Sequence, residues 1–160
     1  MGRVAPRPVG LKPKKPLYFN IDPTGTGAFG SANQFRGSFV TIDRPVLVDR
    51  ARIRVNAGGG ANNISVAIYN RQGTTRLTAS GAIATPANGN ADVVLPEVFL
   101  APGVYFVGMS CDSITPTFVT NASAHVKGAA LTAGAHPAPA TVVVDDGSVG
   151  SLPVIGLFHS

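Results

Sequence analysis

The sequence contains no tryptophan, a single cysteine and few charged residues. Charged side chains make up 13% of its 160 residues, about half of the ~25% that typical soluble domains carry. A lone cysteine excludes an internal disulfide, and we expect Cys111 to be a small buried apolar residue. No uncharged apolar run approaches the ~18–20 residues that cross a bilayer as a helix, so we expect no membrane span.

Glycine and proline are abundant instead. The chain has 19 glycines and 13 prolines, yet 44% of its residues are hydrophobic. Because apolar residues continue between these breakers, the composition favours short strands joined by turns over disorder. It excludes coiled coils and bundles of long helices, since proline and glycine interrupt helices. A chain of this length has room for one domain of ordinary size.

All of the net positive charge lies near the N-terminus. The formal net charge is +5, and residues 1–16 contain no acid. The cations of this stretch are Arg3, Arg7, Lys12, Lys14 and Lys15. Its prolines favour extended backbone and prevent a helix. We therefore expect an extended, basic, proline-rich arm at 1–16 and a formally neutral domain at 17–160.

Two interpretations of the arm stay open. It is either a solvated tail or a segment that orders along an acidic partner surface. Aromatic residues are missing among its cations, which disfavours stacking on single-stranded nucleic acid. The remaining chain adds no net positive charge, so a protein partner is favoured over nucleic acid.

From residue 17 onward, apolar residues recur with a period of two, which is typical of strands. We expect strands at 46–55, 63–69, 91–100, 104–111, 117–120, 141–144 and 154–158, and another that opens at Leu77. A phase slip near Asp49 predicts a bulge, and Asn88-Gly89 predicts a primed hairpin turn. Residues 104–111 are apolar on both faces, as in a central strand. The spacing predicts an all-β fold, a single antiparallel, jelly-roll-like β-sandwich.

Three arginines occupy alternate positions of one expected strand: Arg50, Arg52 and Arg54. One interpretation is a solvated strand face whose charge Asp43 and Asp49 balance. The other is a contact between subunits, because the planar guanidinium pairs well with carboxylates across interfaces.

Motifs for catalysis, cofactors or metals are weak. Gly25, Gly27 and Gly30 have dinucleotide-loop spacing, but no strand precedes them and no helix opens after them. His125, His136 and His159 lie far apart, so they do not predict a metal site. We expect a protein without catalytic, cofactor-binding or metal-binding residues, and therefore not an enzyme.

Several segments together resemble small β-sandwich modules of tailed bacteriophages, which occur in tail fibres, minor tail proteins and capsid decoration proteins. The similar features are an Arg-Ile-x-Val core at 52–55, a Val-x-Ile-Tyr strand at 66–69 and a Leu-x-Pro-Gly-x-Tyr turn at 100–105. Residues 39–50 and the closing 152–157 also fit. The resemblance spans about residues 36–158, and the arm has no counterpart in it.

This resemblance implies a non-enzymatic structural protein of the virion, assembled in the host cytoplasm. The expected role is a capsid decoration (cement) or accessory protein that the arm anchors to neighbouring capsid or tail subunits, with self-association into a homo-oligomer. The alternative is a minor tail or tail-fibre module that binds a host carbohydrate or receptor. Aromatic candidates for stacking on sugar rings are Tyr18, Phe19, Phe29, Phe35 and Tyr69. The resemblance brings no catalytic residues and no cofactor.

Overall fold

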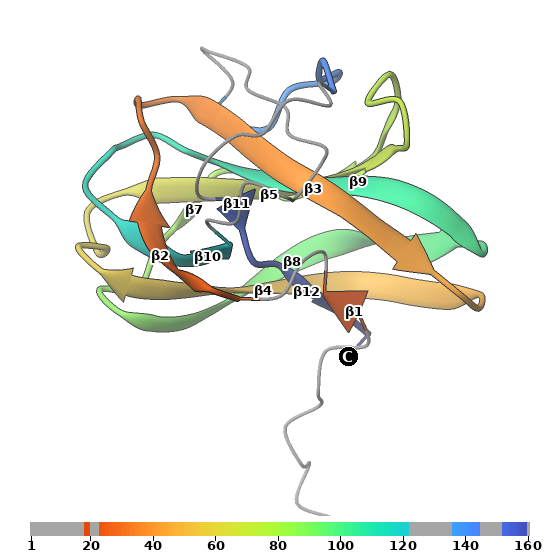
Figure 1. Ribbon diagram of the computed structural model, residues 1–160, viewed down its shortest axis with the longest axis horizontal. Coiled ribbons are helices and arrows are strands. Elements are labelled where there is room, and N and C mark those ends of the chain that lie inside the picture. The colour runs from red at the N-terminus through yellow and green to blue at the C-terminus, as the bar shows by residue number, and fades with distance from the viewer. Residues whose placement is uncertain (1–17, 20–22, 122–135, 145–151, 160) are drawn as a thin grey trace, which may run out of the picture.

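A computed structural model describes residues 18–19, 23–121, 136–144 and 152–159. In these residues the chain forms two antiparallel sheets that pack against each other, and no helix occurs among them (Figure 1). The predicted all-β sandwich is confirmed. The expected arm, 1–16, lies outside the described residues, as does His125.

The first sheet has seven strands with β4 at its centre. Its strands are β1 (Tyr18–Phe19), β2 (Gly25–Ala28), β4 (Val46–Ala57), β8 (Gly89–Leu100), β10 (Thr117–Asn121), β11 (Leu152–Pro153) and β12 (Gly156–Phe158). β8 pairs along one edge of β4, whereas β12 and β10 share the other edge. The β4–β8 register shifts between Val48 and Arg50, which confirms the predicted bulge. Along β8, buried and exposed residues alternate, so one face of this sheet meets solvent.

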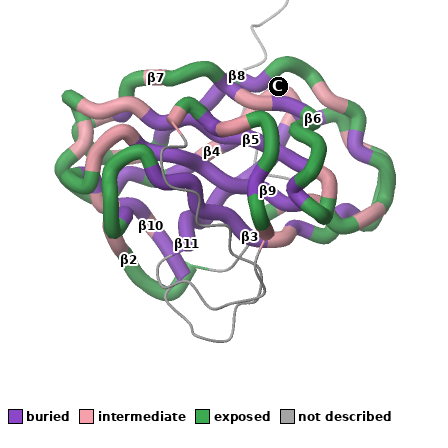
Figure 2. Tube along the Cα trace, turned by 90° about the horizontal axis from the view of Figure 1, so that it is seen from above, coloured by how far each residue is buried: buried purple, intermediate pink, exposed green. Residues whose placement is uncertain are grey.

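The second sheet has five strands, and two of them contain a continuous buried stretch, at 64–69 and at 106–111. Its strands are β3 (Gln34–Ile42), β5 (Asn63–Asn70), β6 (Arg76–Ala79), β7 (Ile83–Ala84) and β9 (Gly103–Cys111). β9 lies between β3 and β5, as expected of a central strand. Figure 2 shows buried backbone running along β9 and β5. Continuous burial of this kind indicates that both faces of the sheet are covered.

The space between the sheets holds the main hydrophobic core. Ile53 from the first sheet packs with Ile64, Ile68 and Met109 from the second. Burying each such side chain contributes about 1.5–3 kcal/mol to the free energy of unfolding. Cys111 is fully buried in this core with a free thiol, as predicted.

A second, smaller core lies on the opposite face of the five-stranded sheet. Residues 136–144, which we call the strap, place Ala138 and Val142 against Phe35, Tyr69 and Phe106. Gly108 permits this cluster, because a Cβ atom there would lie 2.5 Å from the Phe35 ring. The strap closes the face that would otherwise expose three aromatic rings.

The strand predicted at 141–144 is wrong, because these residues belong to the strap and join neither sheet. Val142 is buried and donates its N–H to the carbonyl of Gly73, with an N–O distance of 2.9 Å. Val143 faces solvent and is 77% exposed. The alternation of buried and exposed residues in this segment therefore arises because it packs on the face of a sheet. It does not arise from hydrogen-bonded pairing with a neighbouring strand.

The hairpin predicted at Asn88-Gly89 is also wrong. The strand before it, β7, pairs with β5 in one sheet, whereas β8 pairs with β4 in the other. Gly89 has a φ of +94°, a conformation that L side chains rarely adopt. Gly89 thus lies where the chain passes from one sheet to the other. A glycine with positive φ suits such a connection as well as it suits a hairpin turn, so the local sequence does not tell the two apart.

Candidate functional site

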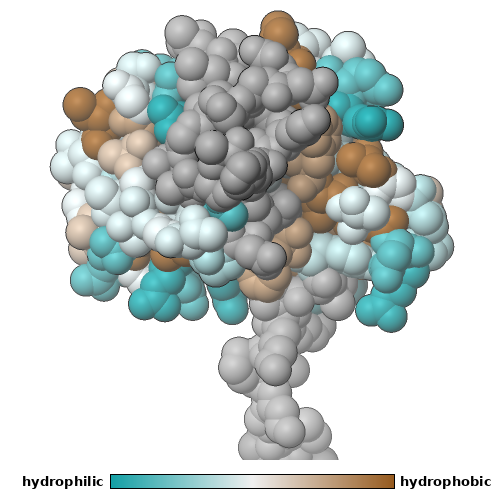
Figure 3. All heavy atoms as spheres, in the orientation of Figure 1, coloured by the Kyte–Doolittle hydropathy of each residue, from teal (hydrophilic) through white to brown (hydrophobic). Residues whose placement is uncertain are grey.

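The side of the seven-stranded sheet that points away from the core carries the most distinctive surface of the molecule. We call it the outer face. It comprises Phe19 of β1, Leu47, Arg50, Arg52 and Arg54 of β4, and Asn90, Asp92, Val94 and Phe99 of β8. Hydrophilic residues gather along the lower rim of the surface in Figure 3, the side on which Figure 1 places β4, β8 and β12.

The structure places the three predicted arginines together on this face. Directly opposite Arg50, Arg52 and Arg54 in the β4–β8 register lie Val94, Asp92 and Asn90, respectively. Side chains of directly opposed residues lie on the same side of a sheet. The arginines therefore form one row whose cross-strand neighbours are an apolar residue, an acid and an amide.

Asp92 is the charge partner of Arg52. The guanidinium donates from Nε to Oδ1 at 2.5 Å and from Nη2 to Oδ2 at 2.7 Å. These hydrogen bonds lower the pKa of Asp92 and raise that of Arg52. The guanidinium carbon also lies 5.2 Å from the centre of the Phe158 ring. Paired on one side and stacked on the other, Arg52 is held in one orientation.

The acids expected to balance the arginine row make other contacts. The Tyr18 hydroxyl donates a hydrogen bond to Asp43, and Asp49 lies 3.4 Å from Nδ1 of His159. The acid that pairs with Arg52 is Asp92. The sequence offered no signal for this pairing, because the two residues are 40 positions apart and only the β4–β8 register aligns them.

Large apolar side chains flank the arginines. Val94, Phe99 and Phe19 are 65%, 63% and 53% exposed, and Phe99 lies opposite Leu47 in register. Each represents apolar area that burial against a partner would remove from water. Exposed aromatic and aliphatic residues among arginines are the composition enriched at protein interfaces.

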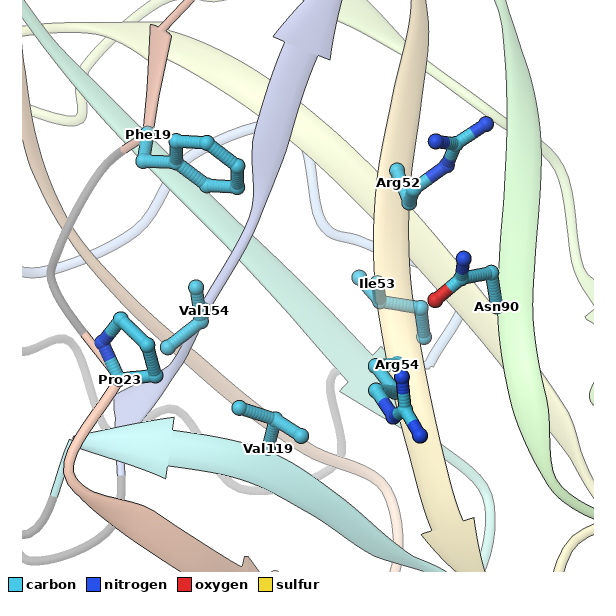
Figure 4. A pocket seen from close by; sticks show the side chains of 8 residues that line it. All are labelled: Phe19, Pro23, Arg52, Ile53, Arg54, Asn90, Val119 and Val154. Carbon is cyan, nitrogen blue, oxygen red and sulfur yellow. The ribbon is translucent and has the colours of Figure 1, made fainter. Parts of the chain in front are cut away.

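Two hollows lie at opposite ends of the outer face. One, of about 430 Å³, lies where β12 and β10 separate along the edge of β4, and Figure 4 shows its lining. The other, of about 510 Å³, lies beside Arg44, Leu47 and Phe99. The face therefore offers recesses for projecting side chains as well as a charged surface.

A serine–histidine pair, of which the serine is buried and the histidine half-buried, lies between β9 and the strap. Ser110 Oγ lies 2.9 Å from His136 Nδ1, and Asp112 is near enough to act electrostatically on the same imidazole. Burial lowers the pKa of His136, while Asp112 acts in the opposite direction. Ser110 is fully buried, so the pair joins the strap to β9 instead of presenting a nucleophile to solvent. Nothing in the sequence links these positions.

The aromatic candidates for sugar stacking separate into buried and exposed groups. Phe29, Phe35 and Tyr69 are buried, at 4%, 0% and 0% exposure, and Tyr18 packs against the main core. Phe19 alone of the five is exposed, and it borders the smaller hollow. The alternation of apolar residues in the sequence could not separate these groups. It does not reveal that the strap covers the outer side of the five-stranded sheet and so buries Phe35 and Tyr69.

In the described part of the chain, no three His, Cys, Asp or Glu side chains gather where they could hold a metal ion. Nor does that part contain a helix with the length and hydrophobicity needed to cross a membrane. The chain matches no protein-family model, no curated protein and no solved structure.

Proposed function

We propose that this chain is a non-enzymatic structural protein of a bacteriophage virion. Its role is that of a capsid decoration (cement) or accessory protein that attaches to neighbouring subunits. The virion setting rests on the sequence resemblance to phage β-sandwich modules across about 36–158. The attachment rests on the geometry of the outer face.

One observation carries the docking role: the outer face combines an arginine row with solvent-exposed Val94 and Phe99. The opposite sheet has its outer aromatic residues covered by the strap. Exposed apolar area beside guanidinium groups is stabilised when a partner buries it and supplies acceptors. A partner protein with an acidic, partly apolar surface fits this face.

In the sequence, the basic residues 1–16 shortly precede a strand at the edge of the same sheet. Residue 18 begins β1, an edge strand of the seven-stranded sheet that pairs with β12. Five cations without a balancing acid precede it in the sequence. Arm and outer face therefore favour the same class of partner, one with exposed carboxylates.

The test uses full-length protein and particles from a phage whose own copy of this gene is deleted. The particles are incubated with the protein, sedimented and analysed for bound chain. We expect wild type to bind and Phe99→Glu to bind at least tenfold more weakly, because the carboxylate places a new charge in the contact. Replacing Arg3, Arg7, Lys12, Lys14 and Lys15 together by Gln should also weaken binding, with a shallower dependence on salt.

The matched control is Val143→Glu, which introduces the same charge at an exposed valine of the strap, away from the outer face. It should bind like wild type. Equal binding of Phe99→Glu and Val143→Glu would contradict docking through the outer face. Failure of the wild-type chain to bind any particle would contradict the virion role. Self-association stays a prediction, and light scattering of the purified chain measures it.

The alternative prediction, a carbohydrate- or receptor-binding tail module, has weaker support in the geometry. Its aromatic candidates are largely inside the protein, and Phe19 is the one at the surface. Reproducible binding on a glycan array that Phe19→Ala abolishes would favour this alternative over the docking role.

A further inference from the structure

We propose that the smaller hollow of the outer face is a docking pocket for an acidic peptide segment of a partner protein. The segment inserts an aliphatic side chain between β4 and β10, and an adjacent carboxylate pairs with Arg54. This inference rests on the proposed function, because it names the partner chemistry that the outer face would recognise.

The pocket exists because the sheet divides. β12 pairs with β4 at Ala51 and Arg52, and β10 pairs with it at Val55, which leaves Ile53 between the two pairings. Val154 leads into β12 and hydrogen-bonds through its N–H to Val119 of β10, 3.1 Å away. On this edge of β4, β12 pairs before Ile53 and β10 pairs after it, and neither strand pairs with Ile53 itself. An opening of about 430 Å³ lies between the two strands.

Apolar side chains line most of this opening. Phe19, Pro23, Val119 and Val154 lie along one side, and β4 with Ile53 lies along the other (Figure 4). The interior is suited to an aliphatic side chain, whose burial there contributes about 1.5–3 kcal/mol. A charged group would lose hydration in the same place without a partner for its charge.

The rim supplies the polar recognition. Arg52 is already engaged by Asp92, whereas Arg54 is exposed and has no ion-pair partner in the described part of the chain. Asn90 lies opposite Arg54 in register and lines the same pocket. A guanidinium beside an amide presents several N–H donors, and a carboxylate accepts from both. The apolar interior of the pocket and the N–H donors at its rim together suit a ligand in which an aliphatic side chain lies next to a carboxylate.

Charge decides among the possible occupants. The chain's own arm carries five cations and no acid, so Arg54 repels it. The outer face of a second copy would bring its own arginine row against this one. Phe19 and Arg54 at the rim are themselves solvent-exposed, so a free small acid bound beside them would remain partly hydrated. A partner segment covers the rim with its own backbone and side chains.

The test is a titration of the full-length, 15N-labelled protein, followed by NMR. The probe is a synthetic hexapeptide of alternating leucine and aspartate with blocked ends, and the comparison peptide has asparagine in place of each aspartate. We expect the acidic peptide to shift the amide signals of Phe19, Ile53, Arg54, Val119 and Val154. The asparagine peptide should bind at least tenfold more weakly.

Two matched substitutions separate the pocket from general attraction to a basic chain. Arg54→Gln should weaken binding of the acidic peptide at least fivefold, whereas Arg50→Gln removes the same charge from the same strand outside the pocket and should change it less than twofold. Phe19→Ala should weaken binding as well, and Phe99→Ala should not. Phe19, Arg54 and Phe99 are exposed and Arg50 is half-buried. Unchanged spectra away from each substitution confirm that the fold persists.

Several results would overturn the pocket. They are equal affinity for the two peptides, equal losses in Arg54→Gln and Arg50→Gln, or shifts confined to residues 1–16. These results are independent of particle binding. If the chain binds the peptide but no particle, the virion role is refuted and the pocket stands. If it binds particles but not the peptide, the pocket is refuted and the virion role stands.

Discussion

The two sheets of this sandwich share one core but differ in what lies on their other sides. The five-stranded sheet is closed by the strap, which buries Phe35, Tyr69 and Phe106. The seven-stranded sheet leaves Val94 and Phe99 in contact with solvent beside its arginines. The strap therefore buries apolar area on the outer side of the five-stranded sheet, and the seven-stranded sheet keeps such area exposed on its own. Under the proposed function, the covered sheet contributes mainly to stability, and the open sheet is the surface that would recognise a partner.

The largest expected effect compares two phenylalanines. Phe106 is fully buried beneath the strap, whereas Phe99 is 63% exposed. Phe106→Ala should lower the free energy of unfolding by about 3–5 kcal/mol, because it removes buried area and leaves a cavity. Phe99→Ala should change it by no more than about 0.5 kcal/mol. Denaturant unfolding measures both, and similar losses would contradict the assignment of an open face.

A smaller effect tests how the strap is held. The Tyr69 hydroxyl donates to the carbonyl of Pro139 at 2.6 Å, and burial raises the pKa of this phenol. Tyr69→Phe should cost about 1–1.5 kcal/mol of unfolding free energy, because the half-buried carbonyl loses its donor. The strap should also become more sensitive to protease. Tyr18→Phe removes a hydroxyl from an exposed contact with Asp43 on the open sheet and should cost less.

The smallest effect is a pH dependence that belongs to the strap. Because burial lowers the pKa of His136, the unfolded chain binds its proton more readily than the folded chain does. The free energy of unfolding should therefore fall as pH drops below about 6.5, the ordinary pKa of histidine. His136→Gln should flatten the pH dependence between pH 5 and about 7. A pH dependence that is as steep in His136→Gln as in the wild type would contradict the assignment to His136.

Much of the fold was predictable because its signals are local. Alternation along 46–55 and the phase slip near Asp49 predicted both β4 and its bulge, and the unbroken apolar run at 104–111 predicted central β9. Signals that depend on a distant neighbour failed. The pattern at 141–144 looks like a strand because Val142 packs on a sheet, although the segment does not pair within one.

The candidate site was predictable only in part. The arginine row followed from its spacing and does lie on an exposed face. Its ion-pair partner Asp92, the flanking Phe99 and the pocket at Ile53 did not follow from the sequence. Each depends on the β4–β8 register or on the division of β4 pairing between β12 and β10.

Amino-acid order alone determined that this chain folds as paired strands, where its positive charge accumulates and which arginines share a side. Those properties arise from neighbours within a few residues, where backbone geometry imposes the period of two. Tertiary structure decided which sheet is covered, which acid Arg52 contacts and where the pocket opens. These depend on the packing of segments far apart in the chain, and local pattern carries no information about distance in space.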